Sequence, residues 1–186
     1  MVARFVINSL YKIEEIISTS ELSKKIKEIA AAIREDFSTS EALVFVGILR
    51  GSMIFLADLL RSVNLVNATV DFMFISSYGN ELNSSGNVKI IKDLEENITN
   101  KDVIIVEDIV DTGLTLQAVV TLLQQRNPKS LKVCALLNKP SKRKVSCYID
   151  YVGFNIEDYF VVGYGIDYAQ KYRSLPYIGK LMFNKS

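Results

Sequence analysis

Residues 103 to 116 read Val-Ile-Ile-Val-Glu-Asp-Ile-Val-Asp-Thr-Gly-Leu-Thr-Leu. The first four are consecutive β-branched residues, a pattern typical of a parallel strand that is covered on both faces. After the glycine, apolar residues recur at the spacing of one helix face, at Leu116, Val119, Val120 and Leu123. The stretch therefore predicts a central strand, a short turn and an amphipathic helix, which together form the repeating unit of an α/β fold.

The turn between this strand and this helix contains Asp111, Thr112, Gly113 and Thr115. At the start of a helix the backbone N–H groups lack partners within the helix, and the helix dipole is positive. Such a terminus binds phosphate. Gly113 allows the backbone to approach a ligand closely, and the two threonines add hydroxyl donors. The sequence therefore predicts a phosphate site at this turn.

Glu107 and Asp108 lie at the carboxyl end of the same strand, where open α/β sheets place their ligands. Their carboxylates can accept hydrogen bonds from vicinal hydroxyls or hold a divalent cation. Acidic residues after a buried strand are commonly only a solvated loop or a helix cap. Three carboxylates joined to a phosphate turn are rarer, and they favour a site for a phosphorylated sugar.

The triplet Asp111-Thr112-Gly113 also occurs in aspartic proteases. There it sits in an all-β setting and works as one of two copies. This chain has one copy followed by a predicted helix, so we set the protease reading aside.

The rest of the chain alternates between strand and helix patterns. Ser18 and Glu21 have the spacing of a capping box, and a helix through Leu22 and Ile33 should follow. Strands are expected near 43 to 48, 69 to 75, 103 to 107 and 131 to 137, and helices near 52 to 63 and 113 to 126. This order predicts an α/β fold with a central parallel sheet flanked by helices, in a single domain over residues 1 to 186. Residues 76 to 87 are rich in glycine, serine and asparagine, as in a flexible loop.

Composition narrows the classes of function. The net charge of +1 provides no broad basic field, so we expect no nucleic-acid partner. The longest apolar runs fall well short of the roughly 18 to 20 residues that cross a bilayer, and the first residues lack the pattern of a secretory signal. We therefore expect a cytoplasmic protein without a membrane partner. The absence of histidine excludes histidine-based triads, and Cys134 is expected to be a small core residue.

The run Val-Glu-Asp-Ile-Val-Asp-Thr-Gly-Leu-Thr from residue 106 resembles the phosphoribosyl pyrophosphate motif of type I phosphoribosyltransferases. Its Glu-Asp pair and flanks are most similar to hypoxanthine-guanine phosphoribosyltransferases. The resemblance continues in the family's order over residues 10 to 182. It includes Leu49-Arg50-Gly51, Ser77-Tyr78, Leu137-Asn138-Lys139, the segment from Phe160 to Tyr168, and Arg173.

This resemblance implies the type I phosphoribosyltransferase fold, with a small hood and a mobile lid loop at Ser77 and Tyr78. The residues implied to bind phosphoribosyl pyrophosphate are Leu49, Arg50, Gly51, Glu107, Asp108, Asp111, Thr112, Gly113, Leu114, Thr115 and Arg173. The Leu114 position varies within the family, so its side chain carries no functional weight. The residues implied to bind the purine are Lys139, Phe160, Val161 and Asp167. Magnesium would be held by Glu107, Asp108 and Asp167.

The implied reaction joins N9 of a 6-oxopurine, hypoxanthine and also guanine, to C1 of phosphoribosyl pyrophosphate. The products are the nucleoside monophosphate and pyrophosphate, as in purine salvage. Asp111 would accept a proton near the purine N7, and the enzyme would form a homodimer or homotetramer. The alternative is a nucleotide-sensing regulatory protein on the same fold, which would need a basic binding face. Lys139 and Phe160-Val161 argue against adenine or a pyrimidine as the base, whereas the choice among hypoxanthine, guanine and xanthine stays open.

Three segments also have plainer interpretations. Leu49-Arg50-Gly51-Ser52 has the composition of a simple turn and cap. In the family this turn binds pyrophosphate through backbone N–H groups and includes a cis peptide before the basic residue. Phe160 is equally compatible with a core aromatic. Lys142, Arg143 and Lys144 are expected to form an ordinary solvated loop.

Overall fold

The computed structural model describes residues 6–7, 11–77 and 88–183. Its main sheet has six strands in the order β5-β4-β3-β6-β7-β8. Five of them run parallel, and β5 pairs with β4 in the antiparallel sense. The strands are β3 (Leu43–Leu49), β4 (Ala68–Ser77), β5 (Val88–Lys92), β6 (Asp102–Val110), β7 (Ser130–Asn138) and β8 (Tyr151–Asn155). The predicted α/β class and the position of β6 inside the sheet are confirmed.

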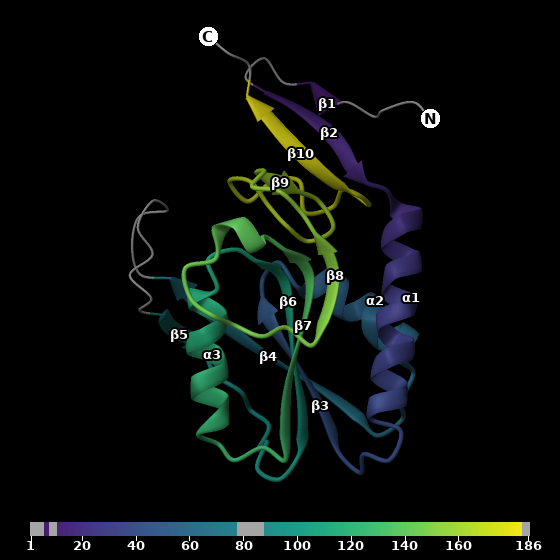
Figure 1. Ribbon diagram of the computed structural model, residues 1–186, viewed down its shortest axis with the longest axis vertical. Coiled ribbons are helices and arrows are strands. Elements are labelled where there is room, and N and C mark those ends of the chain that lie inside the picture. Colours follow the sequence, from purple (N-terminus) through teal and green to yellow (C-terminus); the bar gives the residue numbers. More distant parts are fainter. Residues whose placement is uncertain (1–5, 8–10, 78–87, 184–186) are drawn as a thin grey trace.

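Helices cover both faces of this sheet (Figure 1). The helices α1 (Thr19–Asp36) and α2 (Met53–Val63) pack on one face through residues such as Ile33 and Phe55, against Phe45 and Ile104 of the strands. The helix α3 (Leu114–Gln124) packs on the other face through Leu116, Val119 and Leu123. Burial on two faces explains why β3 and β6 are apolar without alternation.

A second, smaller sheet lies beyond one end of the main sheet (Figure 1). Its antiparallel order is β1-β2-β10-β9. These strands are β1 (Val6–Ile7), β2 (Tyr11–Ile17), β9 (Val161–Val162) and β10 (Ile178–Phe183). Strand periodicity did not predict them, because they are short or pair with partners far away in the sequence. They form the small hood that the resemblance implies.

The capping box at the start of α1 is present as predicted. The Ser18 N–H donates to the Glu21 carboxylate at 2.8 Å, and the Glu21 N–H donates to the Ser18 hydroxyl at 3.3 Å. A 3₁₀-helix, η1 (Pro140–Lys142), follows β7. The helices within the described ranges include none that is long and apolar enough to cross a membrane.

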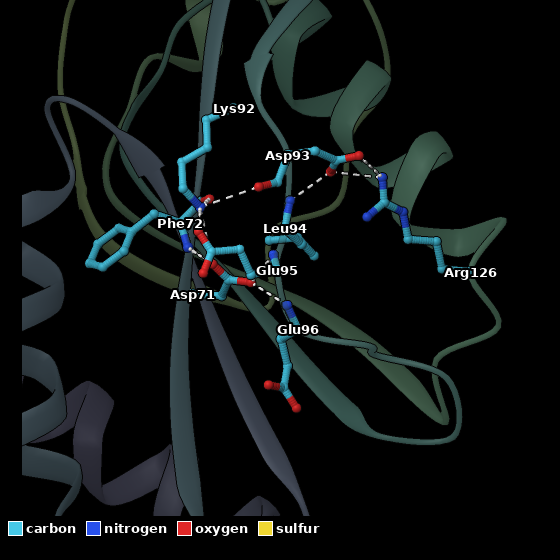
Figure 2. A network of polar contacts seen from close by, with 8 residues as sticks. All are labelled: Asp71, Phe72, Lys92, Asp93, Leu94, Glu95, Glu96 and Arg126. Atoms are coloured by element: carbon cyan, nitrogen blue, oxygen red, sulfur yellow. Dashed lines mark hydrogen bonds and ion pairs between the residues drawn. The ribbon is translucent and has the colours of Figure 1, made fainter.

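A polar network attaches the loop between β5 and β6 to the edge of the sheet (Figure 2). The buried carboxylate of Asp71 in β4 accepts from the backbone N–H groups of Glu95 and Glu96 at 2.7 and 2.8 Å. Arg126 donates to both carboxylate oxygens of Asp93 at 2.8 Å. These contacts hold the chain in place just before it enters β6, the strand that carries Glu107 and Asp108.

Candidate active site

The predicted phosphate turn lies between β6 and α3. Gly113 is the N-cap of α3 and has a φ of 84°, in the left-handed region that favours glycine. A Cβ atom there would lie only 2.9 Å from the sulfur of Cys147. Side chains from the end of β6 and the start of α3 line a hollow at this turn, including Glu107, Asp111 and Thr115. The backbone N–H groups at the start of α3 therefore border a concave surface of a kind that suits a phosphate.

The loop after η1 supports the turn from behind, which corrects the interpretation of this loop as merely solvated. An Arg143 guanidinium nitrogen donates to the carbonyl of Asp111 at 3.1 Å. The backbone N–H of Lys144 donates to the carbonyl of Thr112 at 2.9 Å. Arg143 and Lys144 thus brace the turn, while Lys142 forms an ion pair with Asp158 at 2.8 Å. Sequence spacing carries no signal for these contacts, because they depend on how the loop folds back.

Glu107 and Asp108 face different neighbours, as consecutive residues of a strand do. Glu107 is buried, and its Oε2 is the only buried side-chain nitrogen or oxygen in the described ranges that lacks a hydrogen-bond partner. Burial and the neighbouring charge of Asp108 raise the pKa of Glu107 well above its ordinary value. A buried acceptor without a partner is costly unless a ligand satisfies it.

Asp108 packs against the loop that follows β3. A Cβ atom at Gly51 would lie 1.6 Å from an Asp108 carboxylate oxygen, so only glycine fits there. Burial raises the pKa of Asp108 to about 6, and the negative charge of Asp167 adds to this effect. Two backbone amides and the positive charge of Arg173 act in the opposite direction. Asp108 therefore connects β6 electrostatically with the segment that holds Asp167 and Arg173.

The loop after β3 begins with a cis peptide bond between Leu49 and Arg50. The guanidinium of Arg50 lies 5.1 Å from the centre of the Phe74 ring. Gly165, with a φ of 101°, lies against the loop, since a Cβ atom there would be 2.1 Å from the carbonyl oxygen of Gly51. Gly51 is thus packed between β6 and the segment that follows β9.

Asp167 and Arg173 form an ion pair at 2.7 Å. Arg173 also donates to the carbonyl of Gly165 at 2.8 Å. Gln170 accepts from Arg173 at 3.3 Å and from Arg50 at 3.1 Å. Nothing in the sequence singled out Gln170, because its two arginine partners are brought together only by the fold.

Lys139 lies at the end of β7, and its side chain is buried between two carboxylates. Its ammonium nitrogen is 3.9 Å from Asp111 and 3.7 Å from Asp158. Asp158 was not among the predicted site residues, although it stands only two positions before Phe160. The Lys139 amine is a hydrogen-bond donor group, and it lies where the ends of β7 and the phosphate turn come together.

Phe160 is 67% exposed, so it is not a core aromatic. Its ring contacts the ring of Phe183 edge to face, with centroids 6.2 Å apart. Val161 is buried and pairs with Lys180 of β10. Of the two predicted lid residues, Ser77 ends β4, and Tyr78 lies outside the described residues.

Three carboxylates of the site, those of Glu107, Asp108 and Asp167, are candidate ligands for a divalent cation. The described ranges contain no cluster of three or more metal-ligating side chains, so Glu107, Asp108 and Asp167 do not form such a set. Asp108 and Asp167 do interact through their charges. Mg²⁺ is commonly held by one or two carboxylates together with substrate phosphates. These residues therefore fit a magnesium ion that arrives with a pyrophosphate, rather than one enclosed by protein ligands alone.

Comparison with known proteins agrees with this geometry. The family model described as the phosphoribosyl transferase domain matches residues 12–169. A hypoxanthine phosphoribosyltransferase of Buchnera aphidicola is 51% identical over 94% of this chain and 99% of its own length. A hypoxanthine-guanine phosphoribosyltransferase of Bacillus subtilis is 48% identical over 89% of this chain and 91% of its own length.

A solved structure shows the same likeness in three dimensions. The crystal structure of a hypoxanthine-guanine phosphoribosyltransferase from Bacillus anthracis has a TM-score of 0.86 and 48% sequence identity. The likeness covers 90% of this chain and 98% of that one. With the family model, the sequence relatives and the fold in agreement, this chain belongs to the phosphoribosyl transferase domain family.

Proposed function

We propose that this protein is a purine salvage enzyme that transfers the 5-phosphoribosyl group of phosphoribosyl pyrophosphate to N9 of a 6-oxopurine. Hypoxanthine is the expected base, and guanine a further one. The products are the nucleoside monophosphate and pyrophosphate. One observation carries this proposal: a buried lysine, Lys139, lies 3.9 Å from Asp111, the first residue of the phosphate turn. The proposed donor to the base therefore lies beside the turn that is proposed to bind the phosphate.

The sugar is bound at the end of β6. The N–H groups and hydroxyls from Asp111 through Thr115, with Leu114 contributing only its backbone, receive the 5′-phosphate. Glu107 and Asp108 accept hydrogen bonds from the ribose hydroxyls. The unpartnered Oε2 of Glu107 supports this assignment, because a sugar hydroxyl would satisfy it.

The pyrophosphate is bound by the loop Leu49-Arg50-Gly51 and by Arg173. The reaction develops positive charge on the sugar and negative charge on the departing pyrophosphate. Two guanidinium groups fixed beside the leaving group stabilise that negative charge, and they need no reorganisation when the bond breaks. The hydrogen bonds of Arg50 and Arg173 to Gln170 support such a preset arrangement.

The purine is bound between Lys139 and the segment after β8. Lys139 donates to the carbonyl oxygen at C6, and the exposed ring of Phe160 stacks on the base. Val161 contributes its backbone. Asp111 accepts the proton near N7 as the base is joined to the sugar. Its side chain is 48% exposed, so it is accessible to a ligand in the hollow.

Magnesium is the cofactor that we propose. Asp108 and Asp167 would hold it, with Glu107 close to the sugar hydroxyls, and the ion would neutralise part of the pyrophosphate charge. Ser77 and Tyr78 are proposed as parts of a lid that keeps water from the reacting sugar.

We further propose that the enzyme acts in the cytoplasm, as a homodimer or homotetramer, over a single domain of 186 residues. The support is the family resemblance and the match over nearly all of both relatives' lengths. Light scattering coupled to size-exclusion chromatography would determine the oligomeric state.

A product assay tests the function directly. Hypoxanthine, guanine, xanthine, adenine and uracil are offered separately with phosphoribosyl pyrophosphate and magnesium, and nucleotide formation is followed by chromatography. We expect turnover of hypoxanthine, and none of adenine or uracil at comparable rates. Absence of any product would favour the regulatory alternative, which no observation on this chain supports.

A further inference from the structure

Gln170 occupies a position between the two arginines of the site. Its side-chain oxygen accepts from Arg50 at 3.1 Å and from Arg173 at 3.3 Å. Arg50 follows β3, whereas Arg173 follows β9, so the two arginines come from segments far apart in the sequence. One amide oxygen therefore accepts from two positively charged groups that would otherwise repel each other.

The backbone of Gln170 is tied to the same group of residues. Its N–H donates to one carboxylate oxygen of Asp167 at 2.8 Å, and the other oxygen of Asp167 pairs with Arg173 at 2.7 Å. Gln170, Asp167 and Arg173 thus form a closed ring of polar contacts. The side-chain bond from Gln170 to Arg50 extends this ring to the loop after β3.

The local backbone is held in an unusual conformation. Gln170 has a φ of 63°, and Ala169 and Tyr172 beside it also have positive φ values, of 50° and 73°. Residues other than glycine adopt this region at a cost, and such residues gather at binding sites. In this conformation the Gln170 side chain reaches both arginines.

The neutral charge of Gln170 matters for an anion site. A carboxylate in this place would also accept from both guanidiniums, but it would cancel part of their charge and compete with an incoming anion. An amide oxygen orients the guanidiniums without adding a negative charge to the one that Asp167 already places beside Arg173. A neutral acceptor at this position is therefore favourable for a site that binds a strongly charged anion.

We propose that Gln170 is a positioning residue, which sets the spacing of Arg50 and Arg173 for the pyrophosphate group. This inference rests on the proposed function, since it takes the pyrophosphate to lie at these two arginines. When the pyrophosphate binds, its oxygens accept from the guanidiniums that Gln170 has oriented. Gln170 itself touches neither the reacting carbon nor the base.

Two ligands that differ in the pyrophosphate provide the test. Calorimetry would measure binding of phosphoribosyl pyrophosphate with magnesium, and of inosine monophosphate, which lacks pyrophosphate. The variants are Gln170→Ala, which removes the acceptor, and the isosteric Gln170→Glu, which adds a charge. Lys171→Ala is the matched control, because Lys171 is an exposed neighbour on the same turn.

We expect Gln170→Ala to weaken phosphoribosyl pyrophosphate about three- to tenfold, and Gln170→Glu to weaken it by about tenfold or more. Both variants should bind inosine monophosphate as the wild type does, and Lys171→Ala should match the wild type with both ligands. Steady-state kinetics should show the same split, with a raised KM for phosphoribosyl pyrophosphate and an unchanged KM for hypoxanthine.

Two results would overturn the inference. Wild-type affinity for phosphoribosyl pyrophosphate in both variants would show that Gln170 does not position the arginines. Equal weakening of both ligands would show a general structural role instead. Failure of the proposed function is separate, because it would appear as a wild-type protein that makes no nucleotide from any base.

Discussion

The ammonium nitrogen of Lys139 lies 3.9 Å from a carboxylate oxygen of Asp111. Lys139 comes from the end of β7, and Asp111 follows the end of β6, the neighbouring parallel strand. Asp158 lies on the other side of the ammonium group, at 3.7 Å. The contact between Lys139 and Asp111 links the proposed donor to the base with the proposed proton acceptor. Substitution of either residue should therefore affect catalysis.

Asp111→Asn should lower kcat by about 10- to 10³-fold, the usual range for loss of a general base. The fold should survive, because Lys139 keeps its pairing with Asp158. Steady-state kinetics with hypoxanthine, beside a thermal melting curve, would check both points. Unchanged turnover would remove Asp111 from the proton-transfer role.

Lys139→Ala should abolish most activity on 6-oxopurines. The wild-type site presents an ammonium donor, and adenine also presents a donor at C6, so the wild type should reject adenine by at least ~10³-fold in kcat/KM. In Lys139→Ala, the ratio of kcat/KM for hypoxanthine to kcat/KM for adenine should be smaller than in the wild type. Competition assays with hypoxanthine and adenine measure it, and Lys142→Ala, which removes the exposed lysine paired with Asp158, is a matched control. A wild type that uses both bases equally would contradict the 6-oxopurine assignment.

Replacing Glu107 and Asp108 together by alanine should weaken binding of phosphoribosyl pyrophosphate. The expected loss is about 1 to 3 kcal/mol in kcat/KM, since charge-assisted hydrogen bonds to the sugar are removed. The variant should still fold, because the two carboxylates have raised pKa values from burial and are costly in the free protein. Wild-type affinity for the sugar pyrophosphate by calorimetry would contradict the assignment.

Asp71→Asn tests the network at the edge of the sheet (Figure 2). Burial opposes ionisation of Asp71, but the amides of Glu96, Phe72 and Glu95 donate to it, and its pKa is lowered overall. A carboxylate whose pKa is lowered on folding adds stability above its unfolded pKa, near 3.9, and this stability is lost as the pH falls through the lower folded pKa. The variant should therefore be about 1 to 3 kcal/mol less stable to unfolding at pH 7.

Urea unfolding at several pH values checks this prediction. The difference from wild type should shrink as the pH falls below the unfolded pKa, because the wild-type carboxylate then takes up its proton in the folded protein at a still lower pH. Glu95→Gln is a suitable control, because its side chain is 83% exposed and it should change stability by less than about 0.5 kcal/mol. If the difference in unfolding free energy between Asp71→Asn and the wild type stays constant across the pH range, the charge of Asp71 is not the cause of the lost stability.

The sequence by itself determined the elements whose signals are local. The β-branched run in β6, the helical spacing in α3 and the capping box of α1 depend on neighbours within a few residues, so periodicity reveals them. The turn at Gly113 was also predictable, because a glycine between a strand and a helix restricts the local backbone.

Tertiary structure alone decided how these local elements meet. Gln170 contacts Arg50 across 120 positions of sequence, and Arg143 reaches back 32 positions to the carbonyl of Asp111. Neither contact has a spacing that a sequence pattern can show, because each depends on the packing of separate loops. The strands β2 and β10 escaped prediction for a related reason, since they pair with each other from opposite ends of the chain. The sequence predicted which residue types lie at each turn of the site, whereas the fold alone sets the distances between the charged groups around the ligand.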